Sequence, residues 1–569
     1  MTESKQNGTP IKGAEIAIKT LEKLGVDIVF AYPGGAAIEF HQALKDSPIR
    51  VILPRNEQGG AFAADGYARA TGKTGVCMAT SGPGATNLLT GIADAYMDSI
   101  PMVIITGQVA ASFIGKNAFQ ETDIIGMTRP IVKHSYLVLT PEDIVPSIVN
   151  AFHLANTGRP GPVLIDIPKN VQQAKIPFVF DPQPTLKTYS LPGRVSRDQI
   201  EAIRAAIAKS ERPCIYAGGG IIAAGAAKEL TEFAEKYDIP VVTTLMGVGA
   251  IPEDHPLSLK WLGMHGTYYA NYAANESDLL LAFGARFDDR VTGSVESFAR
   301  DAKIVHVDID QSEINKNVAV DVPVLGDCKE TLAEVIKLLK PGNHKAWRES
   351  FEQFQKIEEE KVINREIHPA EGPLHMGEVI NVVTKATNNE AILVTDVGQN
   401  QMMSARYFKF SKNNSIVTSG GMGTMGFGLP AAIGATFAAP ERTVCFFTGD
   451  GGLQMTIEEF GTIMEQHSPV KIILMNNNYL GNVRQWQQLF FESRYSFTRM
   501  MNPDYEKIAS AYNIPCRTVI DRKDLADAVK EMIETDGPYL LQTVVAEEEN
   551  VLPMCCPGHD VDDMLLELK

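Results

Sequence analysis

Short runs of β-branched and other apolar residues recur along the whole chain, each followed by glycine, serine or a polar turn and then by a helix-forming stretch. Continuous rather than alternating apolar runs are typical of strands buried on both faces, as in parallel sheets. Their alternation with helices predicts an α/β fold of doubly wound parallel sheets. The clearest predicted strands are residues 28–30, 76–78, 102–105, 163–165, 214–216, 279–281, 304–307, 392–394, 444–447, 472–475 and 540–544.

Two stretches without a regular apolar pattern divide the chain. Residues 176–197 are rich in proline, and residues 341–373 combine two turns containing Pro and Gly with a run of Glu and Lys. Such segments are typical of linkers between domains. We expect the charged run at 349–361 to be a solvent-exposed helix face. The expected domains are 1–185, 190–345 and 370–569.

The net charge limits the classes of binding partner that we expect, and the cysteine content indicates the cellular compartment. The 569 residues include 52 Lys and Arg against 69 Asp and Glu, a formal net charge of −17, so we expect no binding to nucleic acid or to an anionic membrane. The 7 cysteines form no CxxC pair, which is typical of reduced thiols in a cytoplasmic protein. We expect no targeting segment, because the first residues lack an apolar core and a basic run. No stretch of about 18 apolar residues predicts a membrane span.

A glycine-flanked aspartate follows one predicted strand, and an asparagine cluster follows the next. Gly449-Asp450-Gly451 comes after the run TVCFF, and Asn477 comes 27 positions after Asp450, behind the run KIILM. Open α/β sheets bind ligands at the carboxyl ends of their strands. A carboxylate, an amide oxygen and a backbone carbonyl are suitable ligands for Mg²⁺ holding a diphosphate. Each half alone is typical of a turn, but the pair at this spacing favours a metal–diphosphate site.

This pair resembles the diphosphate motif of thiamin-diphosphate enzymes. The resemblance implies that the side chains of Asp450 and Asn477 and the backbone carbonyl of Tyr479 bind Mg²⁺. It also implies a glutamate, from another domain, that hydrogen-bonds the pyrimidine of thiamin diphosphate. Glu57 fits, because it stands between the run VILP and a helix-forming stretch, although a lone glutamate here is typical of a helix cap or a surface charge. We expect apolar surroundings to bury Glu57 and raise its pKa.

Longer segments narrow the resemblance to acetohydroxyacid synthase (acetolactate synthase) catalytic subunits, over about residues 12–566. RFDDRVTG (286–293) and QWQ (485–487) are specific to this branch, whereas the Asp450–Asn477 pair marks only the wider family. The resemblance implies decarboxylation of pyruvate and condensation of the two-carbon unit with a second pyruvate or with 2-ketobutyrate. The products are 2-acetolactate and 2-aceto-2-hydroxybutyrate, in the first common step of valine, leucine and isoleucine biosynthesis. Further matching segments are AYPGGA (31–36), TSGPGATN (80–87), AFQETD (118–123), GRPGPVLIDIPK (158–169) and TSGGMGTMGFGLPAAIGA (418–435).

The resemblance also implies roles for individual residues of the thiamin site. Glu57, Gly35 and Gln120 are expected to be catalytic. Arg290 is expected to pair with the carboxylate of the second 2-ketoacid, Trp486 to form an apolar wall, and Lys169 and Phe119 to contact substrate. The other expected contacts to thiamin diphosphate are Pro33, Asn87, Gln399, Gly423, Met425, Gly449, Asp450, Gly451, Gly452, Asn477, Leu480 and Gly481.

The resemblance further implies FAD on the central domain, in a structural role that does not change its redox state. A glycine turn after a strand can receive a diphosphate at the following helix, and Asp308 ends the run IVHVD. The pattern GxGxxG at 421–426 is not expected to bind a dinucleotide, because in the family this loop holds the thiamin pyrimidine. The expected FAD contacts are Arg159, Gly218, Gly219, Gly220, Thr243, Leu245, Met264, His265, Gly284, Arg286, Asp308, Ile309 and Asp327.

Three positions depart from the family pattern. Asn56 and Asn400 stand where histidine is common, and Asn482 stands where methionine or histidine is common. The resemblance implies a homodimer or homotetramer with each active site between two chains. The sequence leaves open which of these forms, whether a small regulatory subunit is required, which amino acid inhibits, and how strongly 2-ketobutyrate is preferred.

Three alternative functions are compatible with parts of this sequence. A pyruvate oxidase-like flavin oxidoreductase would share the three domains and both cofactors, but RFDDRVTG and Trp486 argue against it. A catabolic acetolactate synthase would lack flavin. A catalytically inactive homologue serving only as an assembly subunit would not need Glu57, Asp450 and Asn477, all of which are intact.

Overall fold

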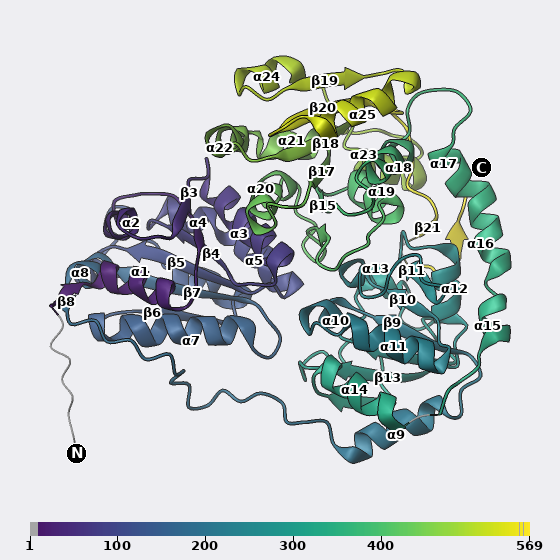
Figure 1. The fold of residues 1–569 in the computed structure, drawn as a ribbon, viewed down its shortest axis with the longest axis horizontal. Coiled ribbons are helices and arrows are strands. Elements are labelled where there is room, and N and C mark those ends of the chain that lie inside the picture. The colour runs from purple at the N-terminus through teal and green to yellow at the C-terminus, as the bar shows by residue number, and fades with distance from the viewer. Residues whose placement is uncertain (1–8, 339, 557, 561–562, 569) are drawn as a thin grey trace.

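Three six-stranded sheets, in which all strand pairings are parallel, organise the chain (Figure 1). The structure is a computed structural model that describes residues 9–338, 340–556, 558–560 and 563–568. Every strand predicted from the apolar runs is present in one of these sheets. Among the described residues, no helix combines the length and the apolar character needed to span a bilayer.

The N-terminal sheet has the strand order β3-β2-β4-β5-β7-β6, and β1 and β8 form a separate antiparallel pair. Its strands are β1 (Ile11–Lys12), β2 (Ile28–Ala31), β3 (Arg50–Ile52), β4 (Gly75–Ala79), β5 (Met102–Gln108), β6 (His134–Leu137), β7 (Pro162–Pro168) and β8 (Lys175–Ile176). Its helices are α1 (Gly13–Lys23), α2 (Ile38–Lys45), α3 (Glu57–Thr71), α4 (Pro83–Asn87), α5 (Leu89–Asp98), η1 (Ala111–Phe113), α6 (Ile124–Thr128), η2 (Arg129–Ile131), η3 (Pro141–Asp143), α7 (Ile144–Asn156) and α8 (Lys169–Gln173).

The central sheet has the order β11-β10-β9-β12-β13-β14. Numbered within the sheet, this is 3-2-1-4-5-6, the order of dinucleotide-binding doubly wound sheets. Its strands are β9 (Pro213–Ala217), β10 (Val241–Thr243), β11 (Ser258–Trp261), β12 (Leu279–Phe283), β13 (Lys303–Asp308) and β14 (Val322–Leu325). Its helices are α9 (Arg197–Ile207), α10 (Gly219–Ala223), α11 (Ala227–Tyr237), η4 (Leu245–Gly247), α12 (Tyr268–Asn275), α13 (Asp289–Thr292) and α14 (Cys328–Leu338).

The C-terminal sheet has the order β16-β15-β17-β18-β20-β19. Numbered within each sheet, the N- and C-terminal orders are the same, 2-1-3-4-6-5. Its strands are β15 (Ile392–Thr395), β16 (Ile416–Val417), β17 (Val444–Gly449), β18 (Val470–Asn476), β19 (Cys516–Val519) and β20 (Tyr539–Val544), and the pair β21 (Met554–Cys555) and β22 (Met564–Leu565) follows. Its helices are α18 (Met376–Ala386), α19 (Gln399–Tyr407), α20 (Gly428–Ala438), α21 (Asp450–Met455), η6 (Ile457–Glu459), α22 (Phe460–Gln466), α23 (Gly481–Phe490), α24 (Tyr505–Ala511), η7 (Arg522–Asp524) and α25 (Leu525–Glu534).

Helices α3 and α20 join the N- and C-terminal sheets of the same chain. Both helices carry glycine where they cross. A methyl group at Gly66 would lie 2.2 Å from the carbonyl oxygen of Ala431, and one at Gly434 would lie 1.9 Å from that of Ala63. The two backbones therefore approach more closely than any side chain would allow. This contact fixes the middle of α3, whose first residue is Glu57, against the C-terminal domain.

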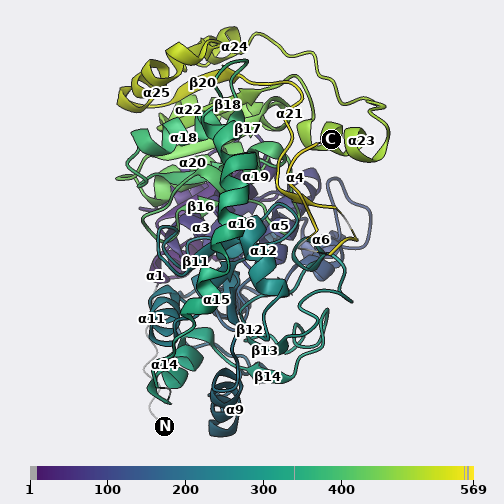
Figure 2. The same cartoon turned by 90° about the vertical axis from the view of Figure 1, so that its right-hand side faces the viewer.

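The second linker is a series of short helices whose charged residues between 349 and 361 are exposed, as expected, except at Glu358. It comprises α15 (Lys345–Glu349), α16 (Glu352–Glu358), η5 (Glu359–Ile363) and α17 (Asn364–Ile367), and α15 and α16 run past the central sheet toward the C-terminal one (Figure 2). The expectation of an exposed charged face is wrong at Glu358, which is fully buried and pairs with Arg406 Nη1 at 2.5 Å. A buried carboxylate requires such a partner, and the sequence run did not reveal that Arg406 would supply it.

Candidate active site

Two carboxylates lie at the point where the strand order of the C-terminal sheet reverses. Thr395 ends β15 and Gly449 ends β17, so Asp396 and Asp450 follow neighbouring parallel strands. Such a switch point is where open α/β sheets form their ligand crevice. The Asp450 side chain begins α21 and is fully buried. Burial raises its pKa, and a hydrogen bond from Asn502 opposes that shift.

Amide oxygens surround Asp450. The Asn502 amide nitrogen lies 2.6 Å from Asp450 Oδ2, 3.0 Å from Asn476 Oδ1 and 3.1 Å from Asn478 Oδ1. Asn477 lies beside this cluster, where its Oδ1 accepts from the Tyr479 N–H at 3.1 Å. Three oxygens thus converge on one nitrogen that has only two hydrogens to donate. This donor set is rich enough in oxygen to hold a hard divalent cation.

Gln399 connects the asparagine cluster to helix α23. Asn477 Nδ2 lies 3.4 Å from Gln399 Oε1, and Gln399 Nε2 donates to the backbone carbonyl of Glu549 at 2.7 Å. A methyl group at Gly481 would lie 2.1 Å from Gln399 Oε1. The first turn of α23, which includes Leu480 as its N-cap, is therefore held close to Asn477.

The loop at residues 418–428 folds over the Asp450 end of the site. The Asp396 carboxylate accepts the N–H of Gly426 at 3.0 and 3.1 Å and that of Gly428 at 3.3 Å. Burial raises the pKa of Asp396 to about 6. A methyl group at Gly451 would lie 3.4 Å from Met425 Cε, and one at Gly452 would lie 2.4 Å from Asp396 Oδ1. Asp396 therefore places Met425 beside the GDG segment, with Gly423 in a left-handed turn at φ 62°.

Glu57 begins α3 on the N-terminal domain. Asn87 Nδ2 donates to Glu57 Oε2 at 3.0 Å, and a methyl group at Gly84 would lie 3.2 Å from Glu57 Oε1. The expectation that Glu57 is buried among apolar residues is wrong for the single chain, in which Glu57 is only half-buried. The reason is its position as the first residue of α3, outside the apolar core.

Asn56 and Glu459 fix the start of α3. The Asn56 side chain accepts from the Gln58 N–H at 2.9 Å, so asparagine serves as the N-cap at this position. Glu459 of the C-terminal domain accepts the backbone N–H groups of Arg55 and Asn56 at 2.9 and 3.1 Å. The helix that carries Glu57 is thus held from both domains of one chain.

The other predicted residues of the N-terminal domain follow neighbouring strands at the same sheet edge. Pro33 and Gly35 come after β2, Gly82 comes after β4, and Gln120 lies in the loop after β5. A methyl group at Gly82 would lie 2.8 Å from the carbonyl oxygen of Gln120, whereas one at Gly35 would face open space. Phe119 is 89% exposed. This edge is therefore an open surface on the single chain.

Arg290 and Trp486 come together from different domains. The Arg290 guanidinium lies over the Trp486 ring at 5.8 Å, and the Trp486 Nε1 has no hydrogen-bond partner among the described residues. A cavity of about 100 Å³ beside Arg290 is also lined by Met264, Asp289, Gly293, Cys555, Cys556 and Gly558. Lys169 lies elsewhere: it adds to the effect of Lys12 in lowering the pKa of Glu39.

The central sheet has its own switch point between β9 and β12. Gly218 follows β9 and Gly284 follows β12. A methyl group at Gly218 would lie 2.1 Å from the Gly284 carbonyl oxygen, and one at Gly220 would lie 2.6 Å from Gly284 Cα. The glycines therefore allow two turns to touch backbone to backbone. Gly219 begins the five-residue helix α10, and Thr243 and Leu245 lie at the end of neighbouring β10.

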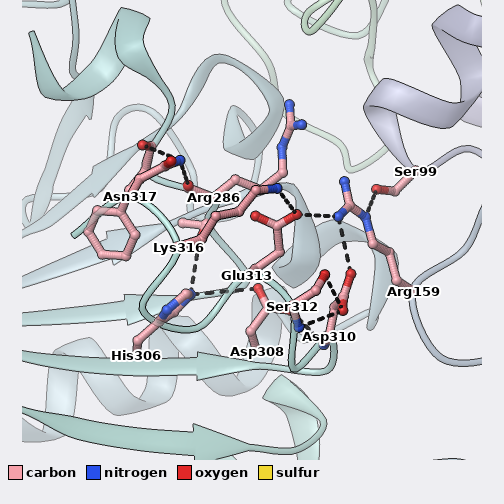
Figure 3. A network of polar contacts seen from close by, with 12 residues as sticks. Ser99, Arg159, Arg286, His306, Asp308, Asp310, Ser312, Glu313, Lys316 and Asn317 are labelled. Carbon is pink, nitrogen blue, oxygen red and sulfur yellow. Dashed lines mark hydrogen bonds and ion pairs between the residues drawn. The ribbon is translucent and has the colours of Figure 1, made fainter. Parts of the chain in front are cut away.

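Acidic residues after β13 meet Arg159 of the N-terminal domain (Figure 3). Arg159 Nη1 lies 2.6 Å from Glu313 Oε1 and 3.2 Å from Asp310 Oδ2. Asp308 Oδ1 accepts the Asp310 N–H at 2.8 Å, with Ile309 between them. Asp327 is engaged differently, because its side chain accepts the Glu330 N–H at 2.9 Å in the first turn of α14.

Two buried histidines, His265 and His306, lie in the central domain. Burial, with nearby Arg406 and Arg290, lowers the pKa of His265 to about 3, so this ring is neutral. Its Nδ1 and that of His306 are buried and have no partner among the described residues. Unpaired buried nitrogens are costly, and a polar ligand could pair with the His265 ring, which is 5% exposed, whereas His306 is fully enclosed by protein.

Comparison with known proteins decides the family. Residues 11–127, 200–335 and 396–543 match the N-terminal TPP binding, central and C-terminal TPP binding domains of thiamine pyrophosphate enzymes. The chain is 48% identical to acetolactate synthase 1, chloroplastic, of Oryza sativa subsp. japonica, over 98% of this chain and 88% of the relative. It is 46% identical to the probable acetolactate synthase large subunit of Methanocaldococcus jannaschii, over 96% of this chain and 94% of the relative. The chain belongs to the acetolactate synthase family.

The residues present fit the thiamin diphosphate of this family. Asn400 and Asn482 flank Gly398, and the side-chain oxygen of each has no partner among the described residues. The Asn400 amide lies next to Gly449, where a methyl group would be 3.7 Å from Asn400 Nδ2, and this nitrogen donates to the backbone carbonyl of Val397 at 3.2 Å. The unpaired amide oxygens are suited to a cation, and the glycine backbone at Gly449 leaves room for the diphosphate that the cation would bridge.

Three site residues of this acetolactate synthase family member were not predicted from its sequence. Asp396 directly follows strand β15, as Asp450 directly follows β17. The rule that pointed to Asp450 could therefore have identified Asp396 as well. Asn502 lies in a loop without a motif, 25 positions after Asn477. Glu459 positions Glu57 indirectly, because it binds the backbone just before Glu57 only when the N- and C-terminal domains pack together. No local pattern marks the last two residues.

Proposed function

We propose that this chain is the catalytic subunit of an acetolactate synthase that decarboxylates pyruvate and joins the two-carbon unit to a second 2-ketoacid. Acceptors are pyruvate, giving 2-acetolactate, and 2-ketobutyrate, giving 2-aceto-2-hydroxybutyrate. The observation that carries the proposal is the Arg290–Trp486 pair, beside a thiamin-type site and within near full-length identity to acetolactate synthases. An arginine binds a carboxylate, and a flat aromatic face offers an apolar contact for the acyl group.

Thiamin diphosphate, when bound, supplies the chemistry that releases CO2 and forms the new carbon–carbon bond. Glu57 holds the proton exchanged with the pyrimidine ring nitrogen. Because Asn87 engages Glu57 Oε2, Oε1 is the oxygen left for that exchange. Gly35 offers a backbone N–H at an open edge, and Gln120 lies across the same edge. We assign Arg290 to the carboxylate of the acceptor.

Mg²⁺ is the proposed bridging ion. Asp450 and Asn477, with the backbone carbonyl of Tyr479, would hold it against the diphosphate. The support is the buried carboxylate surrounded by amide oxygens, in a chain whose net charge of −17 would otherwise repel a diphosphate. Among the described residues no group of three or more His, Cys, Asp or Glu side chains is placed to hold a metal.

FAD is proposed on the central domain, without a redox role. The strand order of that sheet, its glycine switch point and the unpaired imidazole nitrogen of His265 support this assignment. Arg159, which ties the N-terminal domain to Asp310 and Glu313, would be among the residues that hold the flavin nucleotide. The buried thiols of Cys77, Cys214 and Cys445, whose pKa burial raises, support a reducing compartment, and we propose the cytoplasm.

A second copy of the chain is the proposed partner. Phe497 and Met501 are 100% and 96% exposed, and they follow α23 near the asparagine cluster. Phe119 is exposed to a similar extent on the open edge beside Gln120. Apolar surface of this kind favours burial in an interface, and it supports a homodimer or homotetramer in which one chain's Glu57 meets another chain's Asp450.

Product analysis tests the proposal. The purified chain is incubated with pyruvate and 2-ketobutyrate in the presence of Mg²⁺, thiamin diphosphate and FAD, and the products are identified by mass spectrometry. We expect 2-acetolactate and 2-aceto-2-hydroxybutyrate, with flavin absorbance unchanged during anaerobic turnover. Bleaching of the flavin with formation of acetyl products would instead assign an oxidase. The Asp450→Ala variant is the matched blank.

A further inference from the structure

One carboxylate of the N-terminal domain holds the loop that carries Met425. Asp98, at the end of α5, accepts two successive backbone N–H groups of the C-terminal domain: Gly420 at 2.8 Å on Oδ2 and Gly421 at 2.7 Å on Oδ1. Arg69 Nη2 also donates to Asp98 Oδ2, at 2.9 Å. The Asp98 side chain is fully buried. A carboxylate is the only side chain that can accept on both oxygens in this way.

The same helix holds the loop a second time, one turn earlier. Asp94 Oδ1 accepts from Ser419 Oγ at 2.8 Å, and Ser419 Oγ accepts the Thr424 N–H at 2.9 Å. Thr424 directly precedes Met425. The segment between these anchors is therefore fixed to α5 at its start and closed on itself just before the residue that lies beside Gly451.

The central domain touches the same two glycines. A methyl group at Gly420 would lie 2.4 Å from Met246 Sδ, and one at Gly421 would lie 3.3 Å from Arg286 Nη2 and 3.0 Å from Asp98 Oδ1. Met246 follows Leu245 in η4, and Arg286 lies two residues after Gly284. Arg286 is itself one of the expected flavin contacts, and Met246 is adjacent to another, Leu245. The loop and the central domain are therefore closely packed at this junction.

We propose that Asp98 is a positioning residue that couples the flavin site to the thiamin site through Gly420 and Gly421. This inference rests on the proposed function. A flavin that fixes Arg286 and η4 favours the loop placement in which Met425 lies beside Gly451, and thiamin diphosphate favours the same placement from the other side. Coupling between binding sites is reciprocal, so each ligand strengthens the other by the same factor. This gives a flavin without redox chemistry a task in the reaction.

Binding titrations without substrate test the coupling. The dissociation constant of FAD is measured by flavin fluorescence, with and without saturating Mg²⁺ and thiamin diphosphate. In the wild-type chain we expect thiamin diphosphate to tighten FAD by at least about fivefold. In Asp98→Asn each ligand still binds alone, but the factor falls toward one, because the amide group turns an N–H toward one of the two backbone N–H groups. The matched control is Asp27→Asn, on the exposed side of the same domain, where Asp27 bonds Tyr67 and Lys73.

A second variant keeps the test decisive if Asp98→Asn fails to fold. Gly421→Ala leaves every charge in place and crowds Asp98 and Arg286 by a few tenths of an ångström, so we expect it to reduce the factor as well. An equal FAD dissociation constant with and without thiamin diphosphate in the wild type would overturn the coupling, as would an unchanged factor in both variants. No FAD binding by the wild type in either condition would overturn the flavin assignment itself, and the coupling with it.

Discussion

The N- and C-terminal sheets have the same strand order but different chemistry at the same place. At its switch point the C-terminal sheet presents two buried carboxylates, Asp396 and Asp450, surrounded by amides. The N-terminal sheet presents glycines and Pro33 there, and the carboxylate proposed for its thiamin contact, Glu57, is half-buried at the start of α3. The comparison shows that one fold supplies the same edge twice, while the few residues after each strand give the two edges different chemistry.

Removing the carboxylate of the C-terminal edge should have the largest effect. In Asp450→Ala the oxygen cluster loses its only charge, so we expect affinity for Mg²⁺ and thiamin diphosphate to fall by at least about 100-fold, in line with the cost of an unpaired phosphate charge. Isothermal titration with and without Mg²⁺ measures it. Asp536→Ala, an exposed change on the same domain, should bind as the wild type does; equal affinity in both variants would remove Asp450 from the metal site.

The carboxylate of the N-terminal edge should affect rate rather than binding. Glu57→Gln keeps the hydrogen-bonding shape but cannot hold a mobile proton, so we expect turnover to fall by about 10²–10⁴. The dissociation constant of thiamin diphosphate should change little. Steady-state kinetics and the titration above separate the two quantities, and near wild-type turnover would show that Glu57 is only a helix-end charge.

The Arg290–Trp486 pair should set the choice of acceptor. In Trp486→Leu we expect the preference for 2-ketobutyrate over pyruvate to fall by about tenfold, since one methylene in a pocket is worth about 1–3 kcal/mol. The product ratio from mixed substrates measures the preference. Phe491→Leu, an exposed aromatic just after the same helix, is the control. If both products fall together at a constant ratio, Trp486 supports the fold and selectivity lies elsewhere.

A further prediction concerns stability rather than binding or turnover: the contribution of Asp396 to stability depends on pH. Burial raises its pKa to about 6, so the folded state favours the protonated acid and this contribution to stability is present at low pH. It is lost as the pH rises from the unfolded value of about 4 through 6, by about 3 kcal/mol for a shift of two units. Asparagine does not titrate, so it lacks this loss. The free energy of unfolding of Asp396→Asn minus that of the wild type, measured in urea, should therefore rise between pH 4 and pH 7. A constant difference across this range would show that Asp396 does not titrate there.

Most of the fold could be predicted from the sequence because interior parallel strands are apolar throughout. Strands β4, β5 and β17, for example, are buried along nearly their whole length and appear as plain apolar runs. The edge strands were missed, since β6 and β19 carry half-exposed polar residues that resemble loops. Interior β10 was missed because it has only three residues.

The site was predictable where one residue follows one strand, and not where domains meet. Asp450 and Asn477 follow this local rule. The placement of Glu459 under the start of α3, and of Asp98 under Gly420, depends on how three domains pack, which no local spacing records. The burial of Glu358 was missed for the same reason, because its partner Arg406 lies 48 residues away.

The most direct test of the account is complementation between the two edges. Glu57→Gln and Asp450→Ala chains, each inactive alone, are mixed under conditions that exchange subunits, and acetolactate formation is measured. If the N-terminal edge of one chain works with the C-terminal edge of another, each mixed dimer has one intact site, and random pairing should restore about a quarter of wild-type activity. If the mixture stays inactive while native mass spectrometry shows mixed dimers, the two edges do not meet between chains and the account is contradicted.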